Sequence, residues 1–238
     1  MQNFLKILRW SVGILFIFSG LIKANDPLGF SYKLKEYFEV FQADTGMAFF
    51  EMFAHIALPL AIIICASEII LGIMLLIGFK RDLTLWLLFA QIAFFTFLTF
   101  YSAYFDVVKD CGCFGDALKL TPWESFTKDI ILLVLILILL INLKYIQPLF
   151  GRLALNITVL ASYIFCLWMA YTVLMHLPFI DFRAYAEGTN IQKGMEIPEG
   201  APRSVYEMNF VYKVNGKEEN FNEKQLMNLP EGAEFVRR

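Results

Sequence analysis

The stretch ALPLAIIICASEIILGIMLLIGF, residues 57–79, decides the fold of this chain. Its length falls within the roughly 17–25 residues that a helix needs to cross a bilayer. Inside lipid every backbone amide needs a partner in the same segment, so a stretch this long and apolar should be helical. One carboxylate, Glu68, interrupts it about halfway. The sequence therefore predicts a membrane-spanning helix with a polar group inside it.

The rest of the chain has the same apolar character. Of its 238 residues, 58% are hydrophobic, 18% are charged and 25 are Phe. An ordinary soluble domain is about 45–50% apolar and about 25% charged. So much apolar surface needs lipid as its solvent. The net charge of −2 excludes a nucleic-acid binder with a basic surface, and four Cys exclude a disulfide-dense secreted scaffold.

Five stretches are long and apolar enough to be predicted as membrane spans: Phe4–Ile22, Ala57–Phe79, Leu83–Tyr104, Asp129–Ile146 and Leu155–Leu177. We therefore expect an all-α polytopic membrane protein. Its parts would be a four-helix membrane domain over residues 1–150, a fifth transmembrane helix over 151–178 and a small β-rich extracytoplasmic tail over 179–238.

Basic residues near the span ends predict a cytoplasmic N-terminus. On one side they crowd into short segments (Lys6, Arg9, Lys80, Arg81, Lys144, Arg152), whereas an equal number on the other side is spread over long loops with many Asp and Glu. We expect a multi-pass protein of the inner membrane whose tail is periplasmic. The first span could instead be a cleavable signal peptide, but FSGLIKANDP lacks an A-x-A cleavage pattern.

Two segments outside the spans have patterns of their own. Residues 27–57 alternate aromatic and charged side chains, which predicts interfacial helices that form either a surface anchor or a lid over a lipid-soluble substrate. In the tail, VYEMNFVYKV and KEENF flank Asn215-Gly216, and this arrangement predicts a β-hairpin. The later AEFV is a candidate third strand.

The motif DCGCFGD, residues 110–116, follows the third span on the expected outer side. A disulfide between Cys111 and Cys113 would close a very small, strained ring, and strain makes a disulfide a labile oxidant. So short a loop constrains little of the unfolded chain, which argues against a stabilising role. The pattern favours a redox-active pair over a structural disulfide or idle thiols. Two thiolates without a nearby His are too few for a metal site.

The start of the fourth span is relevant to these thiols. Thr121-Pro122-Trp123-Glu124 predicts a capping box with Pro at the first helical position. The partial positive charge of a helix N-terminus would favour a thiolate if the cysteine loop folds back onto it.

Glu68 is the second candidate site residue, because a carboxylate is expensive in lipid. Gln91 and Lys23 are its candidate partners. Two interpretations stay open: a protonated Glu bonded between helices, and a role in proton transfer or quinone binding. Cys65 and Cys166, deep in spans two and five, are expected to act as small hydrophobes, with resolving cysteines as the alternative.

Three motifs in this order, FSGLIKANDP, SEIILG and DCGCFGDALKLTPW, resemble the DoxX/MauE family of bacterial membrane proteins over residues 4–146. The resemblance implies a DoxX-like four-helix bundle with the cysteine loop outside the cytoplasm. It links the MauE branch to disulfide formation in an exported partner and the DoxX branch to a thiosulfate:quinone oxidoreductase subunit. The residues on motif positions are Lys23, Asp26, Pro27, Glu68, Cys111, Cys113, Gly115 and Asp116.

The fifth span and the tail, with LPFIDFRAYAEGTNI, resemble a longer Bacteroidota subgroup that has a C-terminal periplasmic extension. In that subgroup the chain continues into a thioredoxin-like region. These 238 residues contain neither such a region nor a second cysteine pair, so a separate thiol or thioredoxin-like protein is the expected periplasmic partner.

The expected function is that of an inner-membrane thiol–disulfide oxidoreductase. Cys111 and Cys113 would exchange electrons between the exported thiol partner and a membrane quinone, with Glu68 as the acid, and we expect no metal and no nucleic acid. The alternative is a non-catalytic membrane subunit that assembles or anchors a larger envelope complex. A small transporter is disfavoured by the lone intramembrane carboxylate and the lack of inverted repeats.

Overall fold

The computed structural model describes residues 2–108, 112, 115–118, 120–183, 186, 188–195, 209–214, 217–222 and 234–237. The chain divides into two units, residues 1–188 and 189–238. The helices of the first unit are α1 (Gln2–Asn25), α2 (Pro27–Thr45), α3 (Phe49–His55), α4 (Ala57–Ile77), α5 (Arg81–Phe105), α6 (Pro122–Ile141) and α7 (Arg152–Met175), with short 3₁₀ turns η1 (Gly115–Ala117) and η2 (Leu143–Tyr145).

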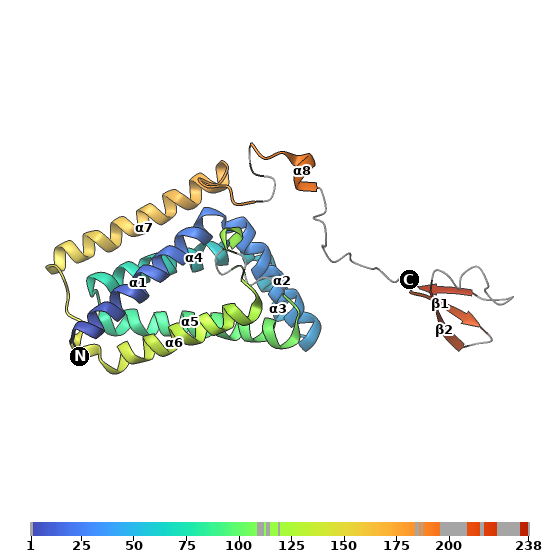
Figure 1. The fold of residues 1–238 in the computed structure, drawn as a ribbon, viewed down its shortest axis with the longest axis horizontal. Helices are drawn as coiled ribbons and strands as arrows, with labels where there is room; N and C mark the ends of the chain where they lie inside the picture. Colours follow the sequence, from blue (N-terminus) through green and yellow to red (C-terminus); the bar gives the residue numbers. More distant parts are fainter. Residues whose placement is uncertain are drawn as a thin grey trace. The chain divides into compact units, whose positions relative to one another are not determined.

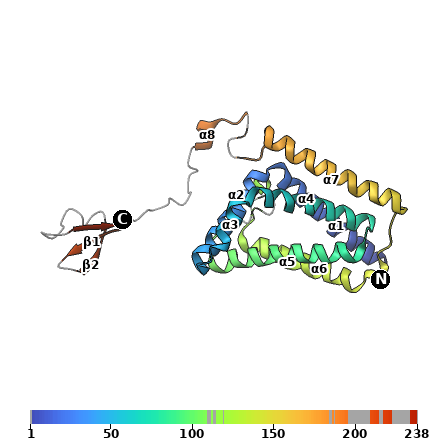
Figure 2. The same ribbon diagram turned by 180° about the vertical axis from the view of Figure 1, so that it is seen from behind.

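Four long helices, α1, α4, α5 and α6, form a bundle, and α2 and α3 lie across one end of it (Figures 1 and 2). Within the bundle α1 packs mainly on α4, and α5 packs mainly on α6. Helix α7 lies along the outside against α4. The tight turn between α4 and α5 passes through Gly78, whose positive φ of 74° suits glycine.

Four helices, α1, α4, α5 and α7, are long and apolar enough to cross a membrane. The chain is therefore a multi-pass membrane protein by length and composition. Helix α6 is not among the four, because it begins earlier than expected and carries Glu124, Lys128 and Asp129 in its first turns. It also ends at Ile141, before the expected Ile146. A total of five spans stays a prediction.

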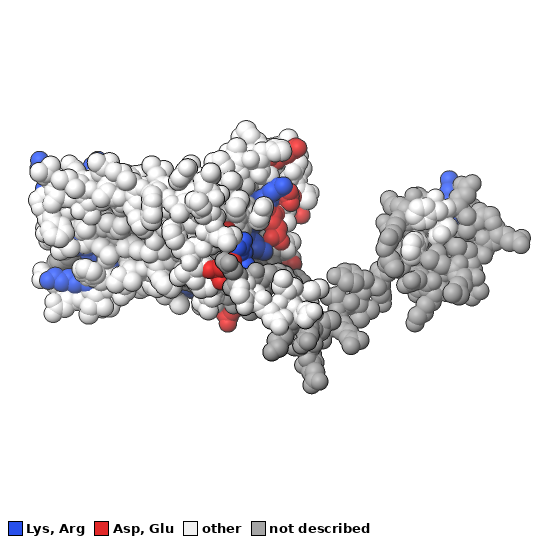
Figure 3. All heavy atoms as spheres, turned by 90° about the horizontal axis from the view of Figure 1, so that it is seen from above, with Lys and Arg blue, Asp and Glu red and all other residues white. Residues whose placement is uncertain are grey.

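The surface has the distribution of charge that a membrane protein needs. In Figure 3 the middle of the helical unit is almost free of charged side chains, which gather at its two ends. Large apolar side chains are exposed along the outer faces, among them Ile141 and Leu153. In water such an apolar belt would be unfavourable, whereas in a bilayer it meets lipid tails.

The motif FSGLIKANDP forms the junction between α1 and α2. Asp26 is the N-cap of α2, and its Oδ1 accepts a hydrogen bond of 2.9 Å from the backbone N–H of Gly29. Pro27 occupies the first helical turn, where its missing N–H has no cost. Asn25 binds the chain after α7: its Nδ2 donates to the carbonyl of Ile180 (2.6 Å), and its Oδ1 accepts from the Ile180 N–H (3.1 Å).

Arg9 joins three segments at the opposite end of the bundle. Its guanidinium is buried and donates to the carbonyls of Leu75 (2.7 Å), Leu76 (2.7 Å) and Gln147 (3.0 Å). Two of these carbonyls belong to the last turn of α4, where a cation also interacts favourably with the helix dipole. Arg9 therefore links α1, the end of α4 and the connection before α7.

The second unit contains the helix α8 (Ile191–Met195) and a three-stranded antiparallel sheet. Its strands are β1 (Asn209–Val214), β2 (Lys217–Asn222) and β3 (Glu234–Arg237), in the order β2-β1-β3. The Val214↔Lys217 pairing encloses residues 215 and 216, where the sequence predicts the turn. Tyr212 of β1 and Phe235 of β3 pack edge to face, with their ring centroids 5.5 Å apart.

Candidate functional site

Glycines bring α1 and α4 into close contact. A Cβ at Gly20 would lie 2.7 Å from Cγ1 of Ile69 and 3.0 Å from the Ile69 backbone N, and a Cβ at Gly72 would lie 2.8 Å from the carbonyl of Gly13. Small residues allow such close approach in membrane helix pairs. Lys23 lies one turn after Gly20 and therefore faces the same part of α4.

This contact places Lys23 against Glu68. The ammonium of Lys23 donates a hydrogen bond to Oε1 of Glu68, and both side chains are almost completely buried, with exposures of 2% and 3%. Of the two candidate partners predicted from the sequence, Lys23 is confirmed. Gln91 instead donates to Ser67 Oγ (2.9 Å) and to the carbonyl of Ile64 (3.2 Å).

Aromatic rings complete the surroundings of the Lys23 ammonium. Its Nζ lies 4.3 Å from the ring centroid of Phe95 and 5.3 Å from that of Phe30. A desolvated cation gains most from such ring contacts. They offset part of the several kcal/mol per ion that burying a charge costs. The pair is thus held by groups from α1, α2, α4 and α5.

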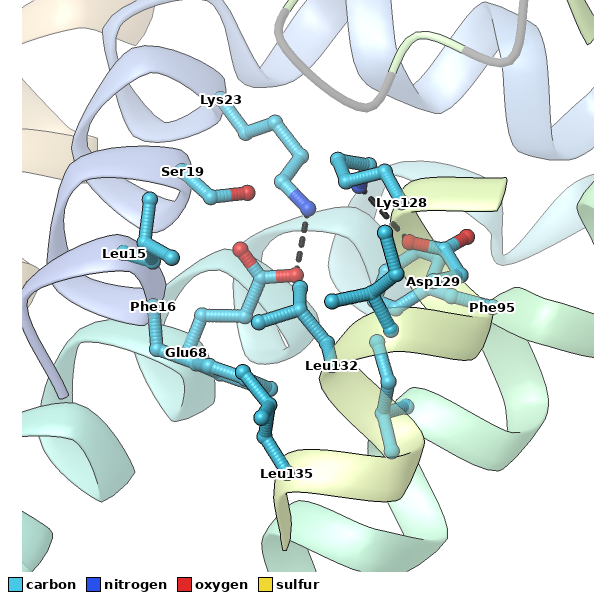
Figure 4. Close-up of a pocket in the computed structure, with 12 residues that line it drawn as sticks. Leu15, Phe16, Ser19, Lys23, Glu68, Phe95, Lys128, Asp129, Leu132 and Leu135 are labelled. Carbon is cyan, nitrogen blue, oxygen red and sulfur yellow. Dashed lines mark hydrogen bonds and ion pairs between the residues drawn. The ribbon is translucent and has the colours of Figure 1, made fainter. Parts of the chain in front are cut away.

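A cavity of about 230 Å³ opens beside the pair (Figure 4). Its walls are mostly apolar and come from α1, α4, α5 and α6; the lining residues include Leu15, Phe16, Ile92, Leu132 and Leu135. Oε2 of Glu68 is buried and makes no hydrogen bond within the described part of the chain, although Ser19 points its hydroxyl toward the same carboxylate. The cavity therefore combines an apolar wall with a buried acid.

A second acid–amine pair lies on the α6 side of the cavity. Lys128 Nζ is 2.7 Å from Oδ1 of Asp129, and Thr99 on α5 donates a hydrogen bond of 3.1 Å to Oδ2. Asp129 is fully buried. Sequence reasoning missed Asp129 because it treated this residue as the edge of the fourth span. An acid placed directly before the apolar run 130–141 was the signal that could have identified it.

The cysteine motif is only partly described. Cys111 and Cys113 lie outside the described residues, and their pairing stays a prediction. Gly112 is buried, has a φ of +65°, and would place a Cβ 3.1 Å from Cγ of Lys33 and 3.8 Å from Cδ2 of Phe30. Gly115 also has a positive φ, and its N–H donates to the carbonyl of Gly112 (3.1 Å). The motif needs glycine at both positions.

The capping box predicted at the start of α6 is confirmed. The Thr121 hydroxyl accepts from the backbone N–H of Glu124, and the Glu124 carboxylate accepts from the Thr121 N–H at 2.9 Å. The Thr121 N–H and the Thr121 hydroxyl both donate to this carboxylate and lower the pKa of Glu124 below its ordinary value. An effect of this helix end on a thiolate stays a prediction.

The two cysteines inside the helices are described. Cys65 on α4 and Cys166 on α7 are free and buried, and both line a small cavity next to Ala24 and Pro27. Their burial among apolar residues suits the interpretation as small hydrophobes. Among the described residues there is no group of His, Cys, Asp and Glu that could hold a metal.

The fold and the buried charges define a multi-pass helical membrane protein whose bundle contains a mostly apolar cavity with buried acid–amine pairs in its wall. Residues 1–142 match the family described as methylamine utilisation protein MauE, and the chain belongs to this family. Membership supports a membrane-associated redox or accessory role. No curated protein and no solved structure matched the chain.

Proposed function

We propose that this protein is a thiol–disulfide redox protein of the inner membrane. It exchanges electrons between an exported thiol or thioredoxin-like partner and a membrane quinone through Cys111 and Cys113. Glu68 is the acid that handles protons at the quinone side.

The observation that carries the proposal is the connection between the cysteine motif and the buried acid through one aromatic ring. A Cβ built at Gly112 would lie 3.8 Å from Cδ2 of Phe30, and the centroid of the Phe30 ring lies 5.3 Å from the ammonium of Lys23. Lys23 in turn binds Glu68 inside the bundle. A thiol site at the bundle end and a proton-carrying group at membrane depth are the two parts that such a reaction needs.

The reaction balances in two steps. A thiolate of the partner attacks one sulfur of the Cys111–Cys113 disulfide, which breaks the S–S bond and forms a mixed disulfide. The second partner thiolate then attacks the partner sulfur of the mixed disulfide and releases the remaining cysteine of this protein as a thiolate. The partner is then oxidised and the Cys111–Cys113 pair is reduced to two thiols. Reoxidation of these thiols sends two electrons and two protons to a quinone, which becomes a hydroquinone. Run backwards, the same equations describe reduction of the partner.

The distribution of charge supports an N-terminus in the cytoplasm. The bundle end that contains the N-terminus shows basic side chains on the face drawn in Figure 3, and the end near α2 and α3 carries acidic ones as well. Basic residues concentrate on the cytoplasmic side of bacterial membrane proteins. In this orientation the cysteine motif faces the periplasm, where thiols are oxidised.

Trapping of the mixed disulfide tests the proposal. In intact cells, Cys111→Ser and Cys113→Ser should be compared for covalent complexes with exported proteins after acid quenching and alkylation. One of the two single variants is expected to accumulate a disulfide-linked complex that dithiothreitol separates by reduction, and the double variant should form no such complex. Cys166→Ala is the matched control, because it removes a buried thiol outside the motif.

The same experiment decides against the alternative. A subunit that only assembles a larger envelope complex would keep its partners after both cysteines are replaced, and it would form no reducible complex in either single variant. Undiminished cellular function of the double variant would favour that role.

A further inference from the structure

The cavity enclosed by α1, α4, α5 and α6 opens toward lipid. At its rim lie Leu15 of α1 and Ile131 of α6, which are 43% and 54% exposed, whereas Glu68 is buried at its inner side. Both rim residues are apolar and belong to the outer faces of their helices. A ligand that reaches Glu68 by this opening arrives from the bilayer.

The charges in the cavity select for a neutral ligand. Lys23 balances Glu68, and Lys128 balances Asp129, so the two pairs together contribute no net charge. A phosphate or carboxylate headgroup would need an excess of positive charge. A neutral ring with carbonyl oxygens needs only hydrogen-bond donors, and the two ammonium groups are donors on different walls of the cavity (Figure 4).

The size of the cavity fits a ring without a long substituent. Its volume of about 230 Å³ exceeds the roughly 150 Å³ of a protein cavity that binds benzene. It is smaller than the roughly 300–1,000 Å³ of sites that enclose a drug-sized ligand. A bound molecule with a long apolar tail would leave the tail between α1 and α6, in contact with lipid.

We infer that this cavity binds the ring of a lipid-soluble quinone between the Lys23–Glu68 and Lys128–Asp129 pairs. The inference rests on the proposed function and assigns the site at which the electrons are exchanged. Each acid–amine pair holds one proton that it can transfer, so the two pairs match the two protons that the acceptor takes up with two electrons. The protons lost by the two thiols on reoxidation replace those that the two pairs supply.

A larger groove elsewhere on the protein is the competing location. It has a volume of about 690 Å³, lies between α4, α5 and α7, and includes Ser67, Gln91 and Leu87 in its wall. Among the described residues that line it there is no carboxylate. It offers a surface for apolar chains but no acid, and it therefore serves as the internal control.

Photolabelling of the full-length protein in lipid nanodiscs tests the inference. A photoreactive ubiquinone analogue with its azido group on the ring should label peptides of α1 or α6, and excess unmodified quinone should compete. Ile131→Trp narrows the opening at an exposed position and should weaken labelling about tenfold, the effect of about 1.4 kcal/mol in binding free energy. Leu87→Trp in the other groove should leave labelling unchanged.

Each outcome distinguishes the site from the redox function. Labelling that maps to the α4–α5–α7 groove, or that is absent from the folded protein, overturns the inference even if mixed disulfides form. The variant with both Cys111→Ser and Cys113→Ser should still be labelled in the cavity. If the cavity is labelled but no mixed disulfide with a partner can be trapped, the quinone site is supported and the proposed thiol chemistry is overturned.

Discussion

Gly20 of α1 faces Glu68 of α4 so closely that a methyl group at Gly20 would lie 3.0 Å from the Cβ of Glu68. This contact sets the distance between the two helices, and the helix distance lets Lys23 reach the carboxylate. Packing of the backbones and formation of the buried ion pair are therefore coupled, and the coupling can be tested by substitution.

Enlarging Gly20 should separate the helices. Gly20→Val places branched carbon atoms against Ile69 and should lower the free energy of unfolding by about 1–3 kcal/mol, the range for overpacked sites. Denaturant unfolding in detergent micelles measures this loss. Gly151→Ala is the control, since nothing lies within 4 Å of a Cβ there. Equal stability of the two variants would contradict the close contact.

Removing one member of the Lys23–Glu68 pair should cost more than removing both. Lys23→Met or Glu68→Leu leaves a buried charge without its partner, which costs about 3–5 kcal/mol, whereas the double variant leaves none. The unfolding free energies of the unmodified protein, the two single variants and the double variant form a double-mutant cycle.

The exposed pair Lys35–Glu39, at 3.6 Å, is the reference for that cycle. Its two side chains are more than half exposed, so the same substitutions there should couple by less than about 1 kcal/mol. Additive losses at Lys23 and Glu68 would show that the two groups do not interact.

Replacing Asn25 should release the chain that follows α7. Asn25→Ala removes both hydrogen bonds to the Ile180 backbone. The Ile180 amide should then exchange with deuterium about fivefold faster, since the bond contributes of the order of 1 kcal/mol. Gln147→Ala is the control: it removes an exposed hydrogen bond from the Gln147 side chain to the carbonyl of Lys144, at the opposite end of the bundle, and should not change the exchange rate of the Ile180 amide. Unchanged exchange in Asn25→Ala would falsify the assigned contact.

Gly112→Ala should disturb the cysteine motif through two effects. The positive φ of 65° costs about 1–2 kcal/mol with a Cβ, and the new methyl group meets Lys33. Gly46 has a similar positive φ of 69° without any neighbour within 4 Å of an added Cβ, so Gly46→Ala measures the backbone effect alone. Alkylation rates of Cys111 and Cys113 under reducing conditions should change in Gly112→Ala and stay constant in Gly46→Ala.

Much of the membrane domain follows from the sequence, because long apolar stretches have few alternatives in lipid. The four spans within α1, α4, α5 and α7 could be predicted from length and hydropathy. The capping box of Thr121 and Glu124 could be predicted as well, since its spacing is local. Lys23 was identified as a candidate for Glu68 because its stem can bend back from the helix end.

The parts that sequence reasoning missed depend on contacts between distant segments. Asp129 gains its role from Thr99, thirty positions away and on another helix. Gly20 of α1 and Gly72 of α4 each lie close to the backbone of the facing helix. This close approach depends on the rotation of α1 against α4, which composition does not specify. The cavity is lined by side chains of four helices that are far apart in the sequence, so only its acid, Glu68, could be identified in advance.

Arg9 makes the two ends of the helical bundle electrostatically different. By binding three carbonyls where α1, α4 and the connection to α7 meet, its guanidinium leaves a fixed positive charge at the end of the bundle remote from α2. A permanent cation repels hydronium ions in a low-dielectric interior. A proton or metal ion therefore enters the bundle from this end at a higher cost in free energy than from the end near α2 and α3, where acidic side chains also lie.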